Sequence, residues 1–364
     1  MDLAYSALAL QVQCRSVNSL DIPAARQQIF NNIDHVAKQV KSSLGFIKTF
    51  SGEAVRLVVL PEYFLTGFPM GESIAEWKAK AVLDIDGEEY NRLAKIAQDN
   101  KIYLSGNAYE ADPNFPELYF QTCFIMSPAG NTVLRYRRLI SMFSPTPHDV
   151  WQPYLDIYGY EAVFPVAKTE IGNLAAIASE EILYPEIARC LAMQGAEVFM
   201  HNTSEIASPG LSPKDIAKRA RAIENMAYVV SANSAGIADI SLPVNSADGM
   251  SKIIDTKGRV LAESTIGETM VAYAELNISS LRALRLKPAM TNLLARQRNE
   301  LFAPTYQQTV YPANNMLPQL NDQKPINRQH FIDTQVNVID DLIAKGIFHS
   351  DTSHSDTSCL EKGK

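Results

Sequence analysis

One glutamate of this 364-residue sequence follows an almost wholly aliphatic segment and is the first candidate for acid–base chemistry. Residues 55–60 are almost entirely aliphatic, as in a buried strand that is covered on both faces, and the segment ends abruptly at Pro61-Glu62. We therefore expect Glu62 at the end of a strand, where a partly buried carboxylate can accept a proton near neutrality. A carboxylate that only caps a turn would occupy the same place, and this alternative stays open.

The cysteines and histidines are scattered along the sequence. None of the cysteines forms a CxxC pair or a cluster with histidine; they are Cys14, Cys123, Cys190 and Cys359. Zinc sites and disulfide frameworks both require closely patterned ligands or pairs. We therefore expect reduced thiols, no metal site and no cofactor.

The composition indicates a globular protein. With 46% hydrophobic and 20% charged residues, the chain can bury a large core. Its net charge of −7 argues against a nucleic-acid partner, because phosphate binding needs clustered lysine and arginine. The apolar run at residues 7–10 is too short to span a bilayer and lacks a basic leader. We expect a cytoplasmic protein with no membrane partner.

Helices and strands alternate along residues 5–276. The patterns of apolar residues predict strands at 5–12, 55–60, 102–106, 122–127, 132–136, 174–178, 198–201 and 229–232. They predict helices at 23–44, 88–100, 186–194 and 213–226, and a last hairpin around residues 255–258. Because βα units occur together with hairpins, we predict one α/β domain at residues 1–276, built on mixed sheet.

The pattern loosens after residue 276. Two basic, leucine-rich stretches at 281–286 and 292–301 resemble helices, and the segment at 303–328 is rich in Pro, Asn and Gln. Such a segment is unsuited to a core of its own. We expect residues 277–330 to form an extension that packs on a neighbouring subunit, with Arg282 and Arg285 among the cations available to cross the interface. A short helix at 333–345 and a disordered tail are expected within the last region, residues 331–364.

Four short motifs occur in an order that resembles the nitrilase, or carbon–nitrogen hydrolase, superfamily. They are LPEYF at 60–64, YRR at 136–138, YPEIAR at 184–189 and RAIEN at 221–225. The resemblance covers about residues 5–276. It implies a four-layer α-β-β-α sandwich of two mixed β-sheets, and a homodimer or higher homo-oligomer in which the sheets and helices stack across the dimer.

The resemblance also implies an active site for amide or nitrile hydrolysis, built in the family from glutamate, lysine and cysteine. Glu62 matches the family's general base. Arg138, in the YRR motif, stands where the family has the lysine that stabilises the developing oxyanion. Counting back from the YPEIAR motif places Ser179 where the family has its cysteine nucleophile.

Both replacements change the chemistry that the site can perform. An arginine keeps its proton far above neutrality and presents a rigid planar fork, so Arg138 can stabilise an oxyanion or pair with Glu62 but cannot shuttle a proton. A serine hydroxyl is a weak nucleophile that needs an effective base, whereas a thiol supplies some thiolate unaided. Arg138 can equally be a structural partner of buried carboxylates, and that alternative stays open.

Further side chains are expected around these three. Glu180 adds a carboxylate beside Ser179, and Glu181 matches an acidic position of the family. If these carboxylates approach Arg138, we expect an ion pair between Arg138 and Glu62. The match of Asp149 to a loop glutamate of the family is loose, and a solvated loop residue is its alternative. The candidate substrate-binding residues are Tyr63, Glu180, Tyr184, Asp149 and Trp151.

Two functions of different classes remain open, and a third possibility, a purely structural subunit of an assembly held by the extension after residue 276, excludes neither of them. The first is an amidase-like hydrolase that acts on a small amide, nitrile or carbamoyl compound through Ser179, Glu62 and Arg138, with ordinary cysteine-dependent activity lost. The second is a catalytically inactive protein of the same fold that binds a small ligand or a partner protein. Pocket-lining loops decide the substrate, which similarity of fold does not identify.

Overall fold

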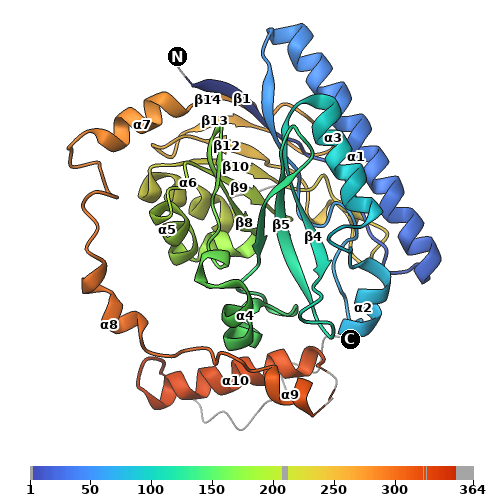
Figure 1. The fold of residues 1–364 in the computed structure, drawn as a ribbon, viewed down its shortest axis with the longest axis vertical. Coiled ribbons are helices and arrows are strands. Elements are labelled where there is room, and N and C mark those ends of the chain that lie inside the picture. The colour runs from blue at the N-terminus through green and yellow to red at the C-terminus, as the bar shows by residue number, and fades with distance from the viewer. Residues whose placement is uncertain (1–2, 207–211, 323, 325, 350–364) are drawn as a thin grey trace.

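Two six-stranded mixed sheets form the centre of the molecule (Figure 1). The structure is a computed structural model, and it describes residues 3–206, 212–322, 324 and 326–349. The first sheet contains, in spatial order, β14 (Tyr273–Asn277), β1 (Ala4–Ala9), β3 (Val55–Val59), β4 (Tyr103–Ala111), β5 (Tyr119–Met126) and β6 (Thr132–Arg137). The second contains β13 (Val260–Glu263), β12 (Lys252–Ile254), β10 (Tyr228–Ala232), β9 (Val198–Asn202), β8 (Gly172–Ala178) and β7 (Ala167–Thr169). Two short strands, β2 (Cys14–Arg15) and β11 (Ile237–Ala238), pair separately.

Helices cover the outer face of each sheet, so that the molecule has four layers. The first sheet packs against α1 (Ile22–Ser51) and α3 (Glu88–Asn100), and the second against α5 (Pro185–Met193) and α6 (Pro213–Asn225). The predicted α-β-β-α sandwich is therefore confirmed. The remaining helices are α2 (Ile74–Ala81), α4 (Trp151–Tyr158), α7 (Ile278–Leu286), α8 (Ala303–Tyr306), α9 (Leu317–Asn321) and α10 (Arg328–Ala344). Among the described residues, no helix combines the length and apolarity needed to cross a membrane.

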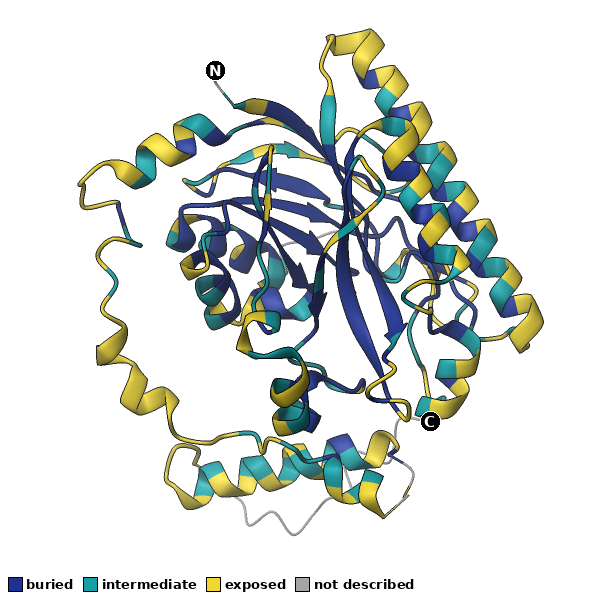
Figure 2. Ribbon diagram, in the orientation of Figure 1, coloured by how far each residue is buried: buried dark blue, intermediate teal, exposed yellow. Residues whose placement is uncertain are grey.

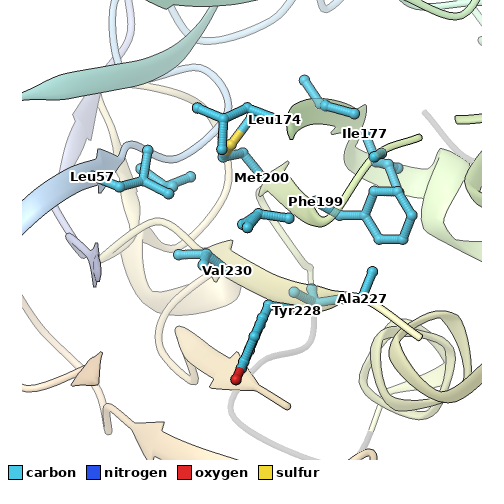
Figure 3. Close-up of a cluster of buried hydrophobic side chains, with 14 of the residues drawn as sticks. Leu57, Leu174, Ile177, Phe199, Met200, Ala227, Tyr228 and Val230 are labelled. Atoms are coloured by element: carbon cyan, nitrogen blue, oxygen red, sulfur yellow. The ribbon is translucent and has the colours of Figure 1, made fainter. Parts of the chain in front are cut away.

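The central core lies between the two sheets. Leu57 of β3 faces residues of the second sheet such as Leu174 and Met200 (Figure 3). Along β3, Leu57 and Val59 belong to this central core, whereas Val58 packs under the helices of the first sheet. This double burial explains why residues 55–60 are aliphatic without alternation.

Helix α1 is longer than the predicted span of 23–44. Asp21 caps its start by accepting a hydrogen bond from the Ala24 amide at 2.9 Å. The predicted helix ends before Gly45. In the structure the helix continues through Gly45, where an added Cβ atom would have no heavy atom within 4 Å. It stops at Gly52, whose φ of 75° is the left-handed conformation that favours glycine.

The segment after β14 differs in part from the expectation. Helices α7 and α10 confirm the helical stretches predicted at 281–286 and 333–345, but the helix predicted at 292–301 is wrong, since only a 3₁₀ turn forms at Asn299–Leu301. Most of this stretch is exposed (Figure 2), and although Leu294 packs against the central core, it is only partly buried and does not provide a continuous apolar face for a helix. The tail at 350–364 lies outside the described residues.

The extension also contacts its own chain. Arg282 forms an ion pair with Glu197 at 2.6 Å, and Arg285 donates to the Ala196 carbonyl at 2.6 Å. These two arginines therefore bind the body of their own subunit. Between α7 and α10, large apolar side chains stay exposed, among them Leu286, Met290, Leu301 and Tyr306. Packing on a neighbouring subunit stays a prediction, which the solution mass of a chain shortened after residue 302 would test.

Candidate active site

Arg138 lies just after β6 and is tied to protein groups through each of its donor nitrogens. Nε donates to the Ile140 carbonyl at 2.7 Å, and Nη1 donates to Gln121 Oε1 at 2.8 Å and to Glu62 Oε1 at 3.4 Å. Nη2 donates to Glu180 Oε1. The predicted ion pair between Glu62 and Arg138 is thus confirmed. Burial disfavours the charge of Arg138, but Glu180 and Glu62 outweigh it and raise its pKa.

Glu62 follows the end of β3, as predicted, but it is fully buried and not partly buried. Its Oε1 also accepts a hydrogen bond from Gln121 Nε2 at 2.7 Å, so Gln121 bridges the carboxylate and the arginine. In the described part of the chain, Glu62 Oε2 is buried and has no hydrogen-bond partner. The Glu62 amide donates to the Thr203 carbonyl at 3.2 Å, which joins the ends of β3 and β9 across the two sheets. Glu62 Oε2 is therefore the carboxylate oxygen that is available to a ligand or a proton.

Ser179 occupies the sharp turn between β8 and α5. Its φ of 47° is left-handed, a conformation that costs a non-glycine residue about 1–3 kcal/mol and that occurs preferentially at functional sites. His201 Nε2 donates to the Ser179 carbonyl at 2.8 Å and holds the turn. The hydroxyl Oγ accepts a hydrogen bond from Lys214 Nζ at 3.1 Å. His201 therefore holds the turn at Ser179, and the cation that contacts the hydroxyl is Lys214 and not Arg138.

Glu181 stabilises the turn at Ser179. Its carboxylate accepts hydrogen bonds from Tyr136 Oη at 2.7 Å and from the amides of Leu139 and Ile140 at 2.7 and 3.0 Å. Burial raises its pKa to about 7, although Arg138 and these donors favour the charged form. Glu181 thus joins the turn at Ser179 to the end of β6, and it acts as scaffold.

The predicted substrate-binding residues divide into two groups. Tyr63, whose φ of 63° is also left-handed, is half-buried next to Glu62, and desolvation together with that carboxylate raises the pKa of its phenol. Tyr184 is 40% exposed, and burial and the nearby Glu180 raise its pKa. Glu180 and Tyr184 belong to the turn that begins at Ser179, and Tyr63 lies within electrostatic range of Glu180 and Arg138, so the structure brings all three to the site.

Asp149 and Trp151 have other neighbours. Asp149 Oδ2 accepts hydrogen bonds from the amide and hydroxyl of Thr146 at 2.7 and 2.8 Å, and so caps a 3₁₀ turn. The interpretation of Asp149 as a solvated loop residue is wrong, because its side chain is buried. Trp151 packs beside His148. The hydrogen bonds of Asp149 go to its own turn and not to Ser179 or Arg138, which leaves a substrate role for either residue a prediction.

Three residues of the site were not predicted from the sequence. They are Gln121, Lys214 and Thr203. Gln121 is the third residue of β5 and lies just outside the strand that the sequence predicts at 122–127. Lys214 lies in the first turn of α6 and also donates to Thr203 Oγ1 at 3.4 Å. No local signal separates Lys214 from the other basic residues of that helix. In the part of the chain that the structure describes, no cluster of acidic, histidine and cysteine side chains suits a metal ion.

The pKa of His201 gives a prediction on stability. Burial, reinforced by the Lys218 cation, lowers that pKa from 6.5 to about 3. The unfolded chain therefore takes up this proton first as the pH falls, so the stability due to neutral His201 is complete above pH 6.5 and is lost towards pH 3. From pH 7.5 to pH 5 the loss amounts to about 2 kcal/mol.

The measurement is urea unfolding of the wild type and of His201→Gln at both pH values. Glutamine keeps a donor for the Ser179 carbonyl but does not titrate. Glu181, with its pKa raised to about 7, stabilises the folded state as the pH falls and so acts in the opposite direction. The difference between the two proteins removes this contribution, and we expect it to change by about 2 kcal/mol. A difference that is independent of pH would show that His201 is not held neutral.

Comparison with known proteins agrees with this architecture. A sequence profile described as carbon-nitrogen hydrolase matches residues 12–286. The omega-amidase NIT2 of Danio rerio is 25% identical over 273 residues, which are 74% of this chain and 94% of that protein. The nitrilase and fragile histidine triad fusion protein NitFhit of Caenorhabditis elegans is 25% identical over 269 residues, 73% of this chain. The match spans only 58% of that longer protein.

A solved structure shows the same fold. Nit3 of Saccharomyces cerevisiae, described as a member of branch 10 of the nitrilase superfamily, aligns with a TM-score of 0.60 at 20% identity. The alignment covers 78% of this chain and 93% of Nit3. Because the family profile covers well over half of the sequence, this chain belongs to the carbon-nitrogen hydrolase family.

Proposed function

We propose that this chain hydrolyses a carbon–nitrogen bond of a small amide, nitrile or carbamoyl compound with the Ser179 hydroxyl as nucleophile, and that ordinary cysteine-dependent activity is absent. The observation that carries this proposal is the left-handed backbone of Ser179, held by His201 at the end of β8. Such strain persists where the surrounding structure enforces it, and active sites are the usual place. The relative named omega-amidase supports amide-type substrates.

The size of the substrate follows from burial. Glu62 is fully buried, and Ser179 is only 5% exposed. A group that reaches both must be small, and it must exchange its hydration for hydrogen bonds with the site. The candidate ligand is therefore a short carboxamide or a compound of similar size.

The proposed reaction of an amide has two steps. The Ser179 oxygen attacks the carbonyl carbon while its proton passes to Glu62 Oε2, the carboxylate oxygen without a partner in the described residues. The carbon–nitrogen bond then breaks, and the amine leaves with that proton. Water next attacks the serine ester, again with Glu62 as base, and releases a carboxylic acid and the free hydroxyl.

The test is ammonia release from a panel of short aliphatic and aromatic amides, nitriles and carbamoyl compounds. We expect at least one compound to yield ammonia and carboxylate in equal amounts, and an acyl ester on the peptide containing Ser179 after acid quenching, detected by mass spectrometry. Ammonia release with the acyl group on one of the thiols instead would overturn the assignment of the nucleophile.

A second function is favoured by the engagement of Arg138. Four of its five N–H groups already bind protein acceptors, and the carboxylates of Glu62 and Glu180 compensate its charge, so the arginine has little attraction left for a substrate oxyanion. A site of this kind suits a protein that binds a small ligand without turnover. Saturable binding of an amide without ammonia release, measured by calorimetry, would support this function against hydrolysis.

A further inference from the structure

Negative charge at residue 179 requires a cation that is free to meet it. Hydrolysis places such charge on the attacking oxygen and then on the former carbonyl oxygen. Arg138 is the cation expected at this place, but the carboxylates of Glu62 and Glu180 already compensate its charge. An arginine held in this way has little remaining attraction for a new anion, because its field is largely cancelled nearby.

Lys214 is differently placed. Its Nζ lies 3.1 Å from Ser179 Oγ and 3.4 Å from Thr203 Oγ1, and both of these partners are neutral hydroxyls. Within the residues that the structure describes, Lys214 forms no ion pair with a carboxylate at 4 Å or less, and residues 207–211 just before α6 contain no acidic residue. Lys218, one helical turn later, is by contrast paired with the carboxylate of Glu205. Lys214 also acts electrostatically on Glu205, but that carboxylate is paired with Lys218. Among the described residues, the charge of Lys214 is therefore directed at Ser179 without an ion pair of its own.

We propose that Lys214 is the cation that stabilises negative charge on the Ser179 oxygen and on the adjoining oxyanion, in place of Arg138. This role rests on the proposed hydrolysis by Ser179. The ammonium keeps its protons throughout and donates a hydrogen bond to the oxygen that becomes charged, while Glu62 accepts the serine proton. Arg138 then acts as a positioning residue that holds Glu62 and Glu180.

The role of Lys214 can be tested without a substrate. In the Ser179→Cys variant, a thiol replaces the hydroxyl beside Lys214, and a cation within about 4 Å lowers the pKa of a thiol by roughly one to three pH units. The pH dependence of alkylation by iodoacetamide, followed on the peptide containing residue 179 by mass spectrometry, gives the midpoint of that ionisation. The midpoint is the readout because plateau rates also vary with the basicity of the thiolate.

We expect Lys214→Met in the Ser179→Cys background to raise the midpoint by at least about one pH unit. Lys214→Arg should keep most of the lowering, since it keeps the charge. Lys168→Met, which removes an exposed lysine on β7, is the matched control and should leave the midpoint unchanged. Thermal unfolding of each variant verifies that the fold is intact.

The outcomes separate this role from the proposed function. An unchanged midpoint in Lys214→Met would overturn the assignment of Lys214, even if the wild type hydrolyses amides. A raised midpoint would support the assignment even if no compound of the panel is hydrolysed, in which case hydrolysis alone would fail. For an enzyme with activity, Lys214→Met should also lower kcat at least tenfold, and Lys168→Met should not.

Discussion

Replacement of Ser179 by alanine is expected to reduce the rate of ammonia release by roughly 10³-fold or more, because loss of the nucleophile removes the covalent route altogether. The hydrogen bond from Lys214 to Ser179 Oγ contributes only about 1 kcal/mol to folding, so the variant should remain folded. The measurement is the steady-state rate on the best compound of the panel, together with the urea midpoint of both proteins.

Ser204→Ala is a suitable control for this prediction. Ser204 is also a buried serine, and its hydroxyl lies 3.0 Å from that of Ser234. Its removal deletes a comparable hydroxyl without touching Ser179 or Glu62. Hydrolysis that persists at the wild-type rate in Ser179→Ala would exclude Ser179 as nucleophile and would direct attention to a water molecule activated by Glu62.

Replacement of Arg138 by methionine is expected to lower the free energy of unfolding by about 3–5 kcal/mol. The substitution leaves the fully buried carboxylate of Glu62 without its cation and removes the partner of Gln121 Oε1. Breaking one side of a buried ion pair is more damaging than replacing both sides, because the remaining charge stays desolvated. Urea unfolding at pH 7 measures the change.

Two further variants identify the cause of this loss. Adding Glu62→Gln to Arg138→Met removes the unpaired charge and should recover part of the stability. Arg138→Lys keeps the charge but loses the planar fork that reaches four acceptors, so a smaller loss is expected. A loss below about 1 kcal/mol in Arg138→Met would show that Arg138 is not a structural partner of the carboxylates, and its role would then be sought in catalysis.

Much of the fold could be predicted because its signals are local. The aliphatic run before Glu62 predicts a strand that is buried on both faces, and β3 lies between the central core and the outer helices. The short helix α2 was not predicted, although Ser73 and Glu76 form a capping box whose pattern is present in the sequence. The helix wrongly predicted at 292–301 has suitable residues, but most of them are exposed and Leu294 is only partly buried against the core, and propensity alone does not sustain a helix of that length.

In the candidate site, too, some features have local sequence signals and others depend on tertiary contacts. The sequence by itself determined that Glu62 follows β3 and that Ser179 stands at the turn after β8, because strand patterns and the following proline motif are local properties. Only the tertiary structure decided that the carboxylates hold Arg138 and that Lys214 reaches Ser179. Those contacts join residues 35 or more positions apart, on different strands and helices. Their geometry depends on how the two sheets and the outer helices pack together, and no short stretch of sequence contains that information.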